Sequence, residues 1–155
     1  MMPSNSELTM EKQVIRSRAV IVYEGKLLVV RHAHTPQYAA LPGGHLEFGE
    51  DPITGLKREL VEELGVEPLV GRLLYVHTFV GERGGQKVQP FEFFFLVENA
   101  AEYVAPLRDD RSHAYELHGV EWVSPNDVLY LRPQPIWNDF VAGTLLAPEV
   151  RFLVT

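Results

Sequence analysis

Residues 41–66 read LPGGHLEFGEDPITGLKRELVEELGV, a glycine-rich turn followed by a short acidic loop and a stretch with helical periodicity. Asp51 is a favourable N-cap, and Pro52 suits the first helical position because an N–H there would have no intrahelical partner. Gly65 stands where helices commonly end in a left-handed residue. The sequence therefore predicts a helix over residues 52–64.

The predicted helix carries an apolar stripe and an acidic stripe. At about 100° per residue, the apolar side chains that fall on one face and should pack against a core are Ile53, Leu56, Leu60 and Leu64. The carboxylates of Glu59, Glu62 and Glu63 lie along the edge of that face. Because neighbouring like charges repel, these groups must face water, hold raised pKa values or be neutralised by a cation. Oxygen ligands of this kind suit Mg²⁺, whereas a solvated surface helix is the competing interpretation.

The same stretch contains a complete spaced motif. Its specified positions are Gly44, Glu50, Arg58, Glu59, Glu62, Glu63 and Gly65, with Leu60 and Val66 as apolar positions. This pattern resembles the Nudix box, G-x5-E-x7-R-E-U-x-E-E-x-G-U with U apolar, and every specified position matches. With residue frequencies of roughly 7%, a chance match is expected on the order of once in 10⁹ windows. The motif therefore favours the metal-binding interpretation.

The resemblance implies a fold, an activity and a cofactor. The fold would be the α/β Nudix fold, an α/β/α sandwich with a mixed β-sheet in a single domain. The activity would be hydrolysis of a phosphoanhydride bond in a nucleoside diphosphate linked to another moiety. Mg²⁺ would be the cofactor, with Mn²⁺ as a substitute, and the partner would be a small nucleotide substrate.

The resemblance also implies roles for individual residues. Metal ligands would be Glu59, Glu62, Glu63 and a backbone carbonyl of the glycine loop, assigned to Gly43. Arg58 would pair with Glu50, hold the loop against the helix and orient the carboxylates. Catalytic roles would therefore fall to Glu62, Glu63 and Arg58, while Gly44, Glu50 and Gly65 would maintain the junction of loop and helix.

A further catalytic glutamate is expected downstream of the box. Members of the resembling family commonly place one in the loop before a late strand, and Glu116, six residues before Trp122, matches one such pattern. Asp109 and Asp110 are alternatives in the same loop. A solvated loop carboxylate is an interpretation of equal weight, so the identity of the general base stays open.

Three arginines are candidate substrate ligands. Arg16 and Arg18 lie two residues apart, so they share one face of a predicted strand. They are either solvated charges at the start of that strand or groups that reach a phosphate or base. Arg31 closes the next strand, and its guanidinium can grip a phosphate bidentately. Tyr38 precedes the glycine loop, where packing is the expected role.

The remaining segments predict strands before and after the box and a helical C-terminal part. A hairpin over residues 19–23 and 26–31 should turn at Glu24 and Gly25. After the box, the expected elements are a strand over 69–80, a turn over 81–86, a doubly buried strand over 88–97 with Pro90 at its start, and a strand over 116–123. These are followed by a short helix from Ser124, a helix over 136–145 packed through Trp137, Phe140 and Val141, and an edge strand over 150–154.

Length and composition set the outer limits. A chain of 155 residues suits one domain, expected over residues 13–155 after a flexible segment of residues 1–12. The net charge of −7 makes nucleic acid an unlikely partner, and the absence of cysteine excludes thiolate chemistry. No apolar run is long enough to span a membrane and no signal peptide is recognisable, so the expected location is cytoplasmic. Many relatives in the resembling family are dimers, which leaves a homodimer open.

Competing functions remain within the same fold. A catalytically silent Nudix-like domain that senses ADP-ribose or another nucleotide would not need three metal carboxylates. An isopentenyl-diphosphate isomerase of the resembling family would use a cysteine, which this chain lacks. RNA cap hydrolysis is disfavoured by the acidic balance. The moiety attached to the diphosphate is not specified by any sequence pattern, and nucleoside triphosphates, ADP-ribose, nucleotide sugars and dinucleoside polyphosphates all stay open.

Overall fold

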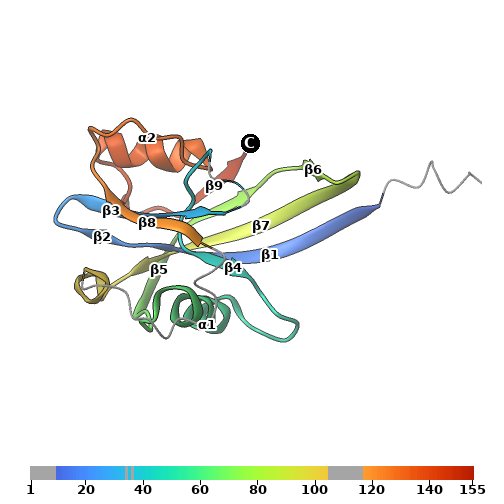
Figure 1. Cartoon of the computed structure of the whole chain (residues 1–155), viewed down its shortest axis with the longest axis horizontal. Coiled ribbons are helices and arrows are strands. Elements are labelled where there is room, and N and C mark those ends of the chain that lie inside the picture. Colours follow the sequence, from blue (N-terminus) through green and yellow to red (C-terminus); the bar gives the residue numbers. More distant parts are fainter. Residues whose placement is uncertain (1–9, 34, 36, 105–116) are drawn as a thin grey trace, which may run out of the picture.

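Two helices lie on opposite sides of the β-structure in the computed structural model, which describes residues 10–33, 35, 37–104 and 117–155 (Figure 1). The strands are β1 (Glu11–Val20), β2 (Val22–Tyr23), β3 (Lys26–His32), β4 (Gly43–His45), β5 (Val70–Thr78), β6 (Gly81–Arg83), β7 (Gln86–Val97), β8 (Leu117–Val123) and β9 (Arg151–Val154). The helices are α1 (Pro52–Leu64), α2 (Gln134–Ala142) and a 3₁₀-helix, η1 (Ala100–Tyr103). β1 therefore begins two residues before the expected start of the domain.

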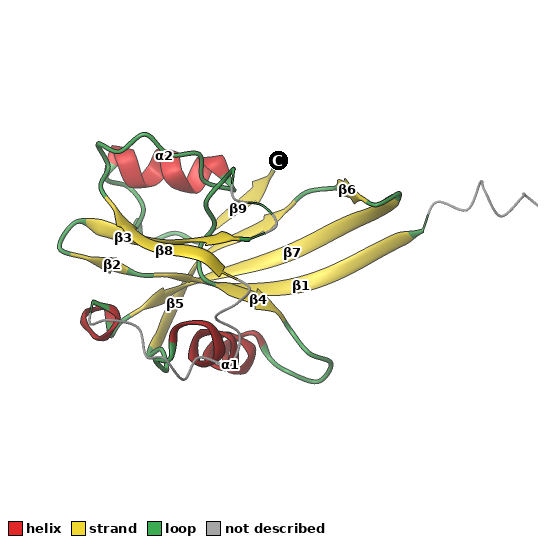
Figure 2. Ribbon diagram, viewed as in Figure 1, coloured by secondary structure: helices red, strands yellow, loops and turns green. Residues whose placement is uncertain are grey.

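The larger sheet is mixed. Its order is β4-β1-β7-β5-β9, with β6 paired to β7. β1 runs parallel to β7 and β9 runs parallel to β5, whereas the other pairs are antiparallel. A second sheet, β2-β3-β8, is antiparallel. Figure 2 shows α1 and α2 enclosing this β-structure, which confirms the α/β/α sandwich expected from the sequence.

Helix α1 begins and ends at the predicted residues. Asp51 accepts hydrogen bonds from the backbone N–H groups of Ile53 and Thr54, both at 2.9 Å, and Gly65 ends the helix with φ of 75°. The leucines of its apolar stripe, Leu56, Leu60 and Leu64, are fully buried. Ile53 is 41% exposed, so its predicted burial is wrong. Beneath this first turn lies Ser17 of β1, whose hydroxyl donates to the Pro52 carbonyl at 2.7 Å, rather than an apolar surface.

The opposite face of the larger sheet packs against α2. Trp137 and Phe140 are buried in one cluster with Val20, Tyr75 and Phe94, as their spacing predicts. Val141 is 49% exposed, which contradicts its predicted packing role. It follows the buried Phe140 by one residue, and a rotation of about 100° takes its side chain out of the cluster. The helix also ends three residues early, because Gly143 adopts φ of 77°.

Three local predictions need correction. The turn expected over residues 81–86 is confined to Gly84 and Gly85, because residues 81–83 pair with β7 as β6. Pro90 lies inside β7 rather than at its start. It stands between the residues that pair with β5 and those that pair with β6, so no backbone N–H donor is needed on that side. The helix expected from Ser124 is a turn, in which Asp127 accepts a hydrogen bond from the Ser124 N–H at 2.8 Å.

Candidate active site

Arg58, in the middle of α1, is the centre of an ion-pair cluster that joins the helix to the loop before it. Its Nε and Nη2 atoms donate to the two carboxylate oxygens of Glu50 at 2.9 and 2.8 Å, which is the pairing expected from the sequence. Its Nη1 atom donates to Glu59 and Glu62, each at 3.2 Å. Nη2 also donates to the His45 carbonyl at 3.1 Å. The hydrogen bonds from Arg58 hold the pKa of Glu50 at about 2, so this carboxylate stays charged and ties the loop to the helix.

The three box carboxylates differ in their exposure to water. The side chains of Glu62 and Glu59 are 26% and 16% exposed, and Glu63 is 3% exposed. Burial raises the pKa of Glu59 despite its contact with Arg58. Carboxylates that are buried close together are stabilised by an added cation, and hard divalent ions prefer such oxygen donors. The donor set therefore fits a divalent metal ion.

The cluster is not arranged as a ready-made metal cage. Among the residues that the structure describes, no three acidic or histidine side chains converge in the way a bound ion requires. Glu59 and Glu62 are turned toward Arg58 instead. Binding of a cation would replace part of the neutralising role that Arg58 has in this state.

Two glycines bring the loop close to these carboxylates. A Cβ atom on Gly44 would lie 2.7 Å from the Glu59 carboxylate, and one on Gly43 would lie 2.0 Å from the Ser17 carbonyl. Gly43 also has φ of 136°, which side-chain-bearing residues rarely adopt. The Gly43 carbonyl, the expected metal ligand, accepts a hydrogen bond from Arg18 Nη1 at 3.3 Å.

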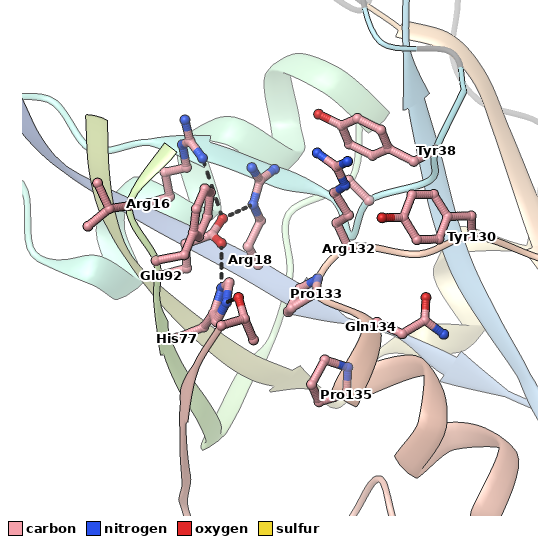
Figure 3. Close-up of a pocket in the computed structure, with 14 residues that line it drawn as sticks. Arg16, Arg18, Tyr38, His77, Glu92, Tyr130, Arg132, Pro133, Gln134 and Pro135 are labelled. Atoms are coloured by element: carbon pink, nitrogen blue, oxygen red, sulfur yellow. Dashed lines mark hydrogen bonds and ion pairs between the residues drawn. The ribbon is translucent and has the colours of Figure 1, made fainter. Parts of the chain in front are cut away.

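Arg16 and Arg18 line a pocket of about 450 Å³ beside the box (Figure 3). Their side chains are 18% and 13% exposed, so they are not the solvated charges of the competing interpretation. Arg18 also donates to the Leu41 carbonyl at 3.3 Å, which places it at the glycine loop. Arg16 Nε donates to His45 Nε2 at 3.2 Å, and burial together with the charges of Arg16 and Arg18 lowers the pKa of His45 to about 4. The neutral ring can therefore accept this bond.

The other wall of the pocket is aromatic. The Arg132 guanidinium lies 4.3 Å from the centre of the Tyr38 ring and 5.4 Å from that of the Tyr130 ring. The two rings stand edge to face at 6.4 Å, and Figure 3 shows the three side chains grouped across the pocket from Arg16 and Arg18. Tyr38 therefore lines the pocket in addition to packing against Tyr130 and Arg132. A pocket with guanidinium groups at one end and aromatic rings at the other suits a phosphate joined to a planar group.

Several pocket residues have no counterpart in the sequence-based site. Tyr130 and Arg132 reach Tyr38 through a backbone contact, in which the Arg132 N–H donates to the Ala39 carbonyl at 3.0 Å. No local pattern predicts that contact. Glu92 and His77 also line the pocket. In the sequence, the one feature that sets Glu92 apart is that it is an acidic residue within the aromatic run FEFFF.

Two sets of candidate residues are not part of the described site. Arg31 is not among the pocket-lining residues, and its Nε donates to Glu121 on β8 at 2.9 Å. Glu116, Asp109 and Asp110 lie outside the described residues. The described site therefore consists of the Arg58 cluster and the adjoining pocket.

Replacement of Arg58 by alanine should impair catalysis while leaving the protein folded. The change removes the group that orients Glu50, Glu59 and Glu62, and loss of such a group at a metal site typically lowers activity or metal affinity about 10- to 100-fold. Steady-state rates and Mg²⁺ titration would measure both quantities. Lys57→Ala, a cation removed from the neighbouring position, is the matched control. Parental rate and metal affinity in Arg58→Ala would show that Arg58 is only a surface charge.

Comparison with known proteins places this chain in a family. The model of the NUDIX domain matches residues 14–142. The chain is 29% identical over 123 residues to phosphatase NudJ of Escherichia coli K12, covering 77% of this chain and 74% of NudJ. The solution structure of the Escherichia coli ORF135 protein is 27% identical, with a TM-score of 0.60 over 95% of this chain and 99% of that chain. An ADP-ribose pyrophosphatase from Streptococcus suis shares the fold at 17% identity, with a TM-score of 0.61 over 90% and 98% of the two chains.

The chain belongs to the Nudix family, as the complete box indicates. As a member of this family the protein is a Nudix hydrolase, an enzyme that acts on phosphoanhydrides. Family members generally use a divalent metal and small nucleotide substrates. Within the described part of the chain, no helix has the length and apolar character needed to cross a membrane.

Proposed function

We propose that this Nudix hydrolase cleaves, with Mg²⁺, the phosphoanhydride bond of a nucleoside diphosphate linked to a second moiety. The observation that supports this proposal best is the contact between the two halves of the site. Arg18 lines the pocket and also donates to the carbonyls of Leu41 and Gly43 in the glycine loop just before the box. A phosphate held by Arg18 would therefore lie beside the box carboxylates.

Glu59, Glu62 and Glu63 would hold the metal, with the Gly43 carbonyl as a further ligand through the lone pair that the hydrogen bond from Arg18 does not use. A bound Mg²⁺ would supply Lewis-acid stabilisation of the charge that develops on the phosphate oxygens. Arg58 holds the carboxylates of Glu59 and Glu62 in position through hydrogen bonds. Glu62 and Glu116 are the candidates for the base that removes a proton from the attacking water.

The pocket would bind both the phosphate and the planar part of the substrate. Arg16 and Arg18 would contact phosphate oxygens through their remaining guanidinium N–H donors. Tyr38, Tyr130 and Arg132 would contact the planar part of the substrate through stacking and cation–π interactions. The names of two similar structures, a UDP-X diphosphatase and an ADP-ribose pyrophosphatase, are consistent with a substrate of this class.

A substrate panel tests the proposal. Nucleoside triphosphates, ADP-ribose, nucleotide sugars and dinucleoside polyphosphates would be incubated with the protein and Mg²⁺, and the products identified by mass. We expect at least one compound to be cleaved at a phosphoanhydride bond. The competing function, a silent nucleotide sensor, requires binding of one of these compounds without turnover of any of them, and that result would overturn the proposal.

A further inference from the structure

A buried acid and histidine pair lies beside the two arginines of the pocket. Glu92 on β7 is 5% exposed, and His77 on the adjacent β5 is 2% exposed. His77 Nδ1 lies 3.0 Å from Glu92 Oε1, and His77 Nε2 lies 2.8 Å from Thr155 Oγ1. Both ring nitrogens of His77 are thus engaged, which fixes the orientation of the ring and of the carboxylate that it contacts.

The second oxygen of Glu92 faces the arginines. Oε2 accepts a hydrogen bond from Arg18 Nε at 3.2 Å and lies 3.8 Å from Arg16 Nη1, as Figure 3 shows. In the sheet register, Glu92 stands opposite Arg16 on β1 and opposite His77 on β5. Directly opposed side chains lie on the same face, so three neighbouring strands form a cation–acid–histidine row.

The neighbours of Glu92 in this row keep its carboxylate ionised. Burial alone would raise its pKa, but the hydrogen bond from His77 and the charges of Arg18 and Arg16 lower it to about 2. An ionised carboxylate strengthens its hydrogen bonds to the groups around it. Glu92 is therefore an anion with a fixed position at the base of the arginine side of the pocket.

Arg18 is held at Nε and Nη1 and is open at its remaining nitrogen. Nε donates to Glu92, and Nη1 donates to the carbonyls of Leu41 and Gly43. Within the described residues, Nη2 donates no hydrogen bond. A guanidinium fixed on one side and open on the other loses little conformational entropy when it binds a ligand.

We propose that Glu92, held by His77, is a positioning residue that fixes Arg18 and Arg16 for the phosphate of the substrate. The proposal rests on the function proposed above. Glu92 has two opposed effects on the binding of phosphate, one through its charge and one through the orientation of the arginines. The negative charge of Glu92 by itself weakens the attraction between the arginines and a phosphate. Orientation of the guanidinium groups outweighs that cost.

The test is Glu92→Gln, assayed with whichever compound of the panel the parent protein hydrolyses. We expect KM to rise about tenfold with kcat changed less than about threefold, because charge-assisted hydrogen bonds that orient a binding group are lost. Glu121→Gln, which neutralises the carboxylate of the Arg31 pair outside the pocket, is the matched control and should leave both constants unchanged. Unchanged or lower KM in folded Glu92→Gln would overturn the proposal.

Two further measurements keep the test decisive. Binding of α,β-methylene-ADP with Mg²⁺, measured by calorimetry, needs no turnover, so weakened binding in Glu92→Gln would support positioning even if the parent hydrolyses nothing. If Glu92→Gln does not fold, His77→Gln and His77→Leu replace it. Glutamine can still donate to Glu92 and leucine cannot, so only the leucine variant should weaken binding. Equal affinity in these two variants would overturn the proposal.

Discussion

Glu63→Gln should lower kcat by at least two orders of magnitude while leaving the fold intact. The substitution keeps the shape and volume of the side chain but removes one of three anionic groups proposed to hold the metal, and electrostatic stabilisation of this kind is worth several kcal/mol in the transition state. Glu63 is 3% exposed, and burial of a carboxylate disfavours its charged form. The metal-free variant should therefore melt at the same temperature as the parent or slightly higher.

The measurement is kcat and metal-free melting temperature for Glu63→Gln, side by side with Glu67→Gln. Glu67 is an exposed carboxylate just beyond α1, so its variant should match the parent in both quantities. A small loss of kcat accompanied by a large fall in melting temperature would assign Glu63 a structural role. Turnover equal to that of the parent would mean that the acidic face of α1 is a solvated surface, and the metal mechanism would fail.

Excess chelator should abolish turnover of every compound that the protein hydrolyses, and added Mg²⁺ or Mn²⁺ should restore it. The reason is the repulsion among Glu59, Glu62 and Glu63, which burial strengthens. Arg58 neutralises Glu59 and Glu62 in the metal-free state, so the loss of activity should not come from unfolding. Initial rates and melting curves recorded in the same buffers would separate these effects. Full turnover in excess chelator would exclude a metal-dependent mechanism.

The parts of the fold that local chemistry determines were predictable. Both ends of α1 follow from Asp51, Pro52 and Gly65, because capping depends on residues within one turn. The contact of Arg58 with Glu50 was also expected, since both belong to one spaced motif. The exposure of Ile53 was not, because helical periodicity identifies a face but does not show where the opposing core ends.

The pocket could be anticipated only in part. Arg16 and Arg18 share a strand face by simple alternation, and the structure places both in the pocket. Their contact with Glu92 depends on the parallel register of β1 and β7, for which the sequence carries no local signal. The aromatic wall depends in the same way on a long-range contact, the hydrogen bond from Arg132 to Ala39.

The parallel pairing of β1 with β7 also has a consequence for how the enzyme folds. Residues 11–20 pair with residues 87–96, so the central strand β7 and its neighbour β1 meet only after a long loop has closed. A nascent chain that has emerged only as far as Val66 contains the complete box but lacks β7, the parallel partner of β1. Non-local pairing of this kind slows folding. Helix α1 is therefore synthesised well before the sheet that supports it can assemble, and Arg16 and Arg18 acquire their acidic partner, Glu92, in the same late step.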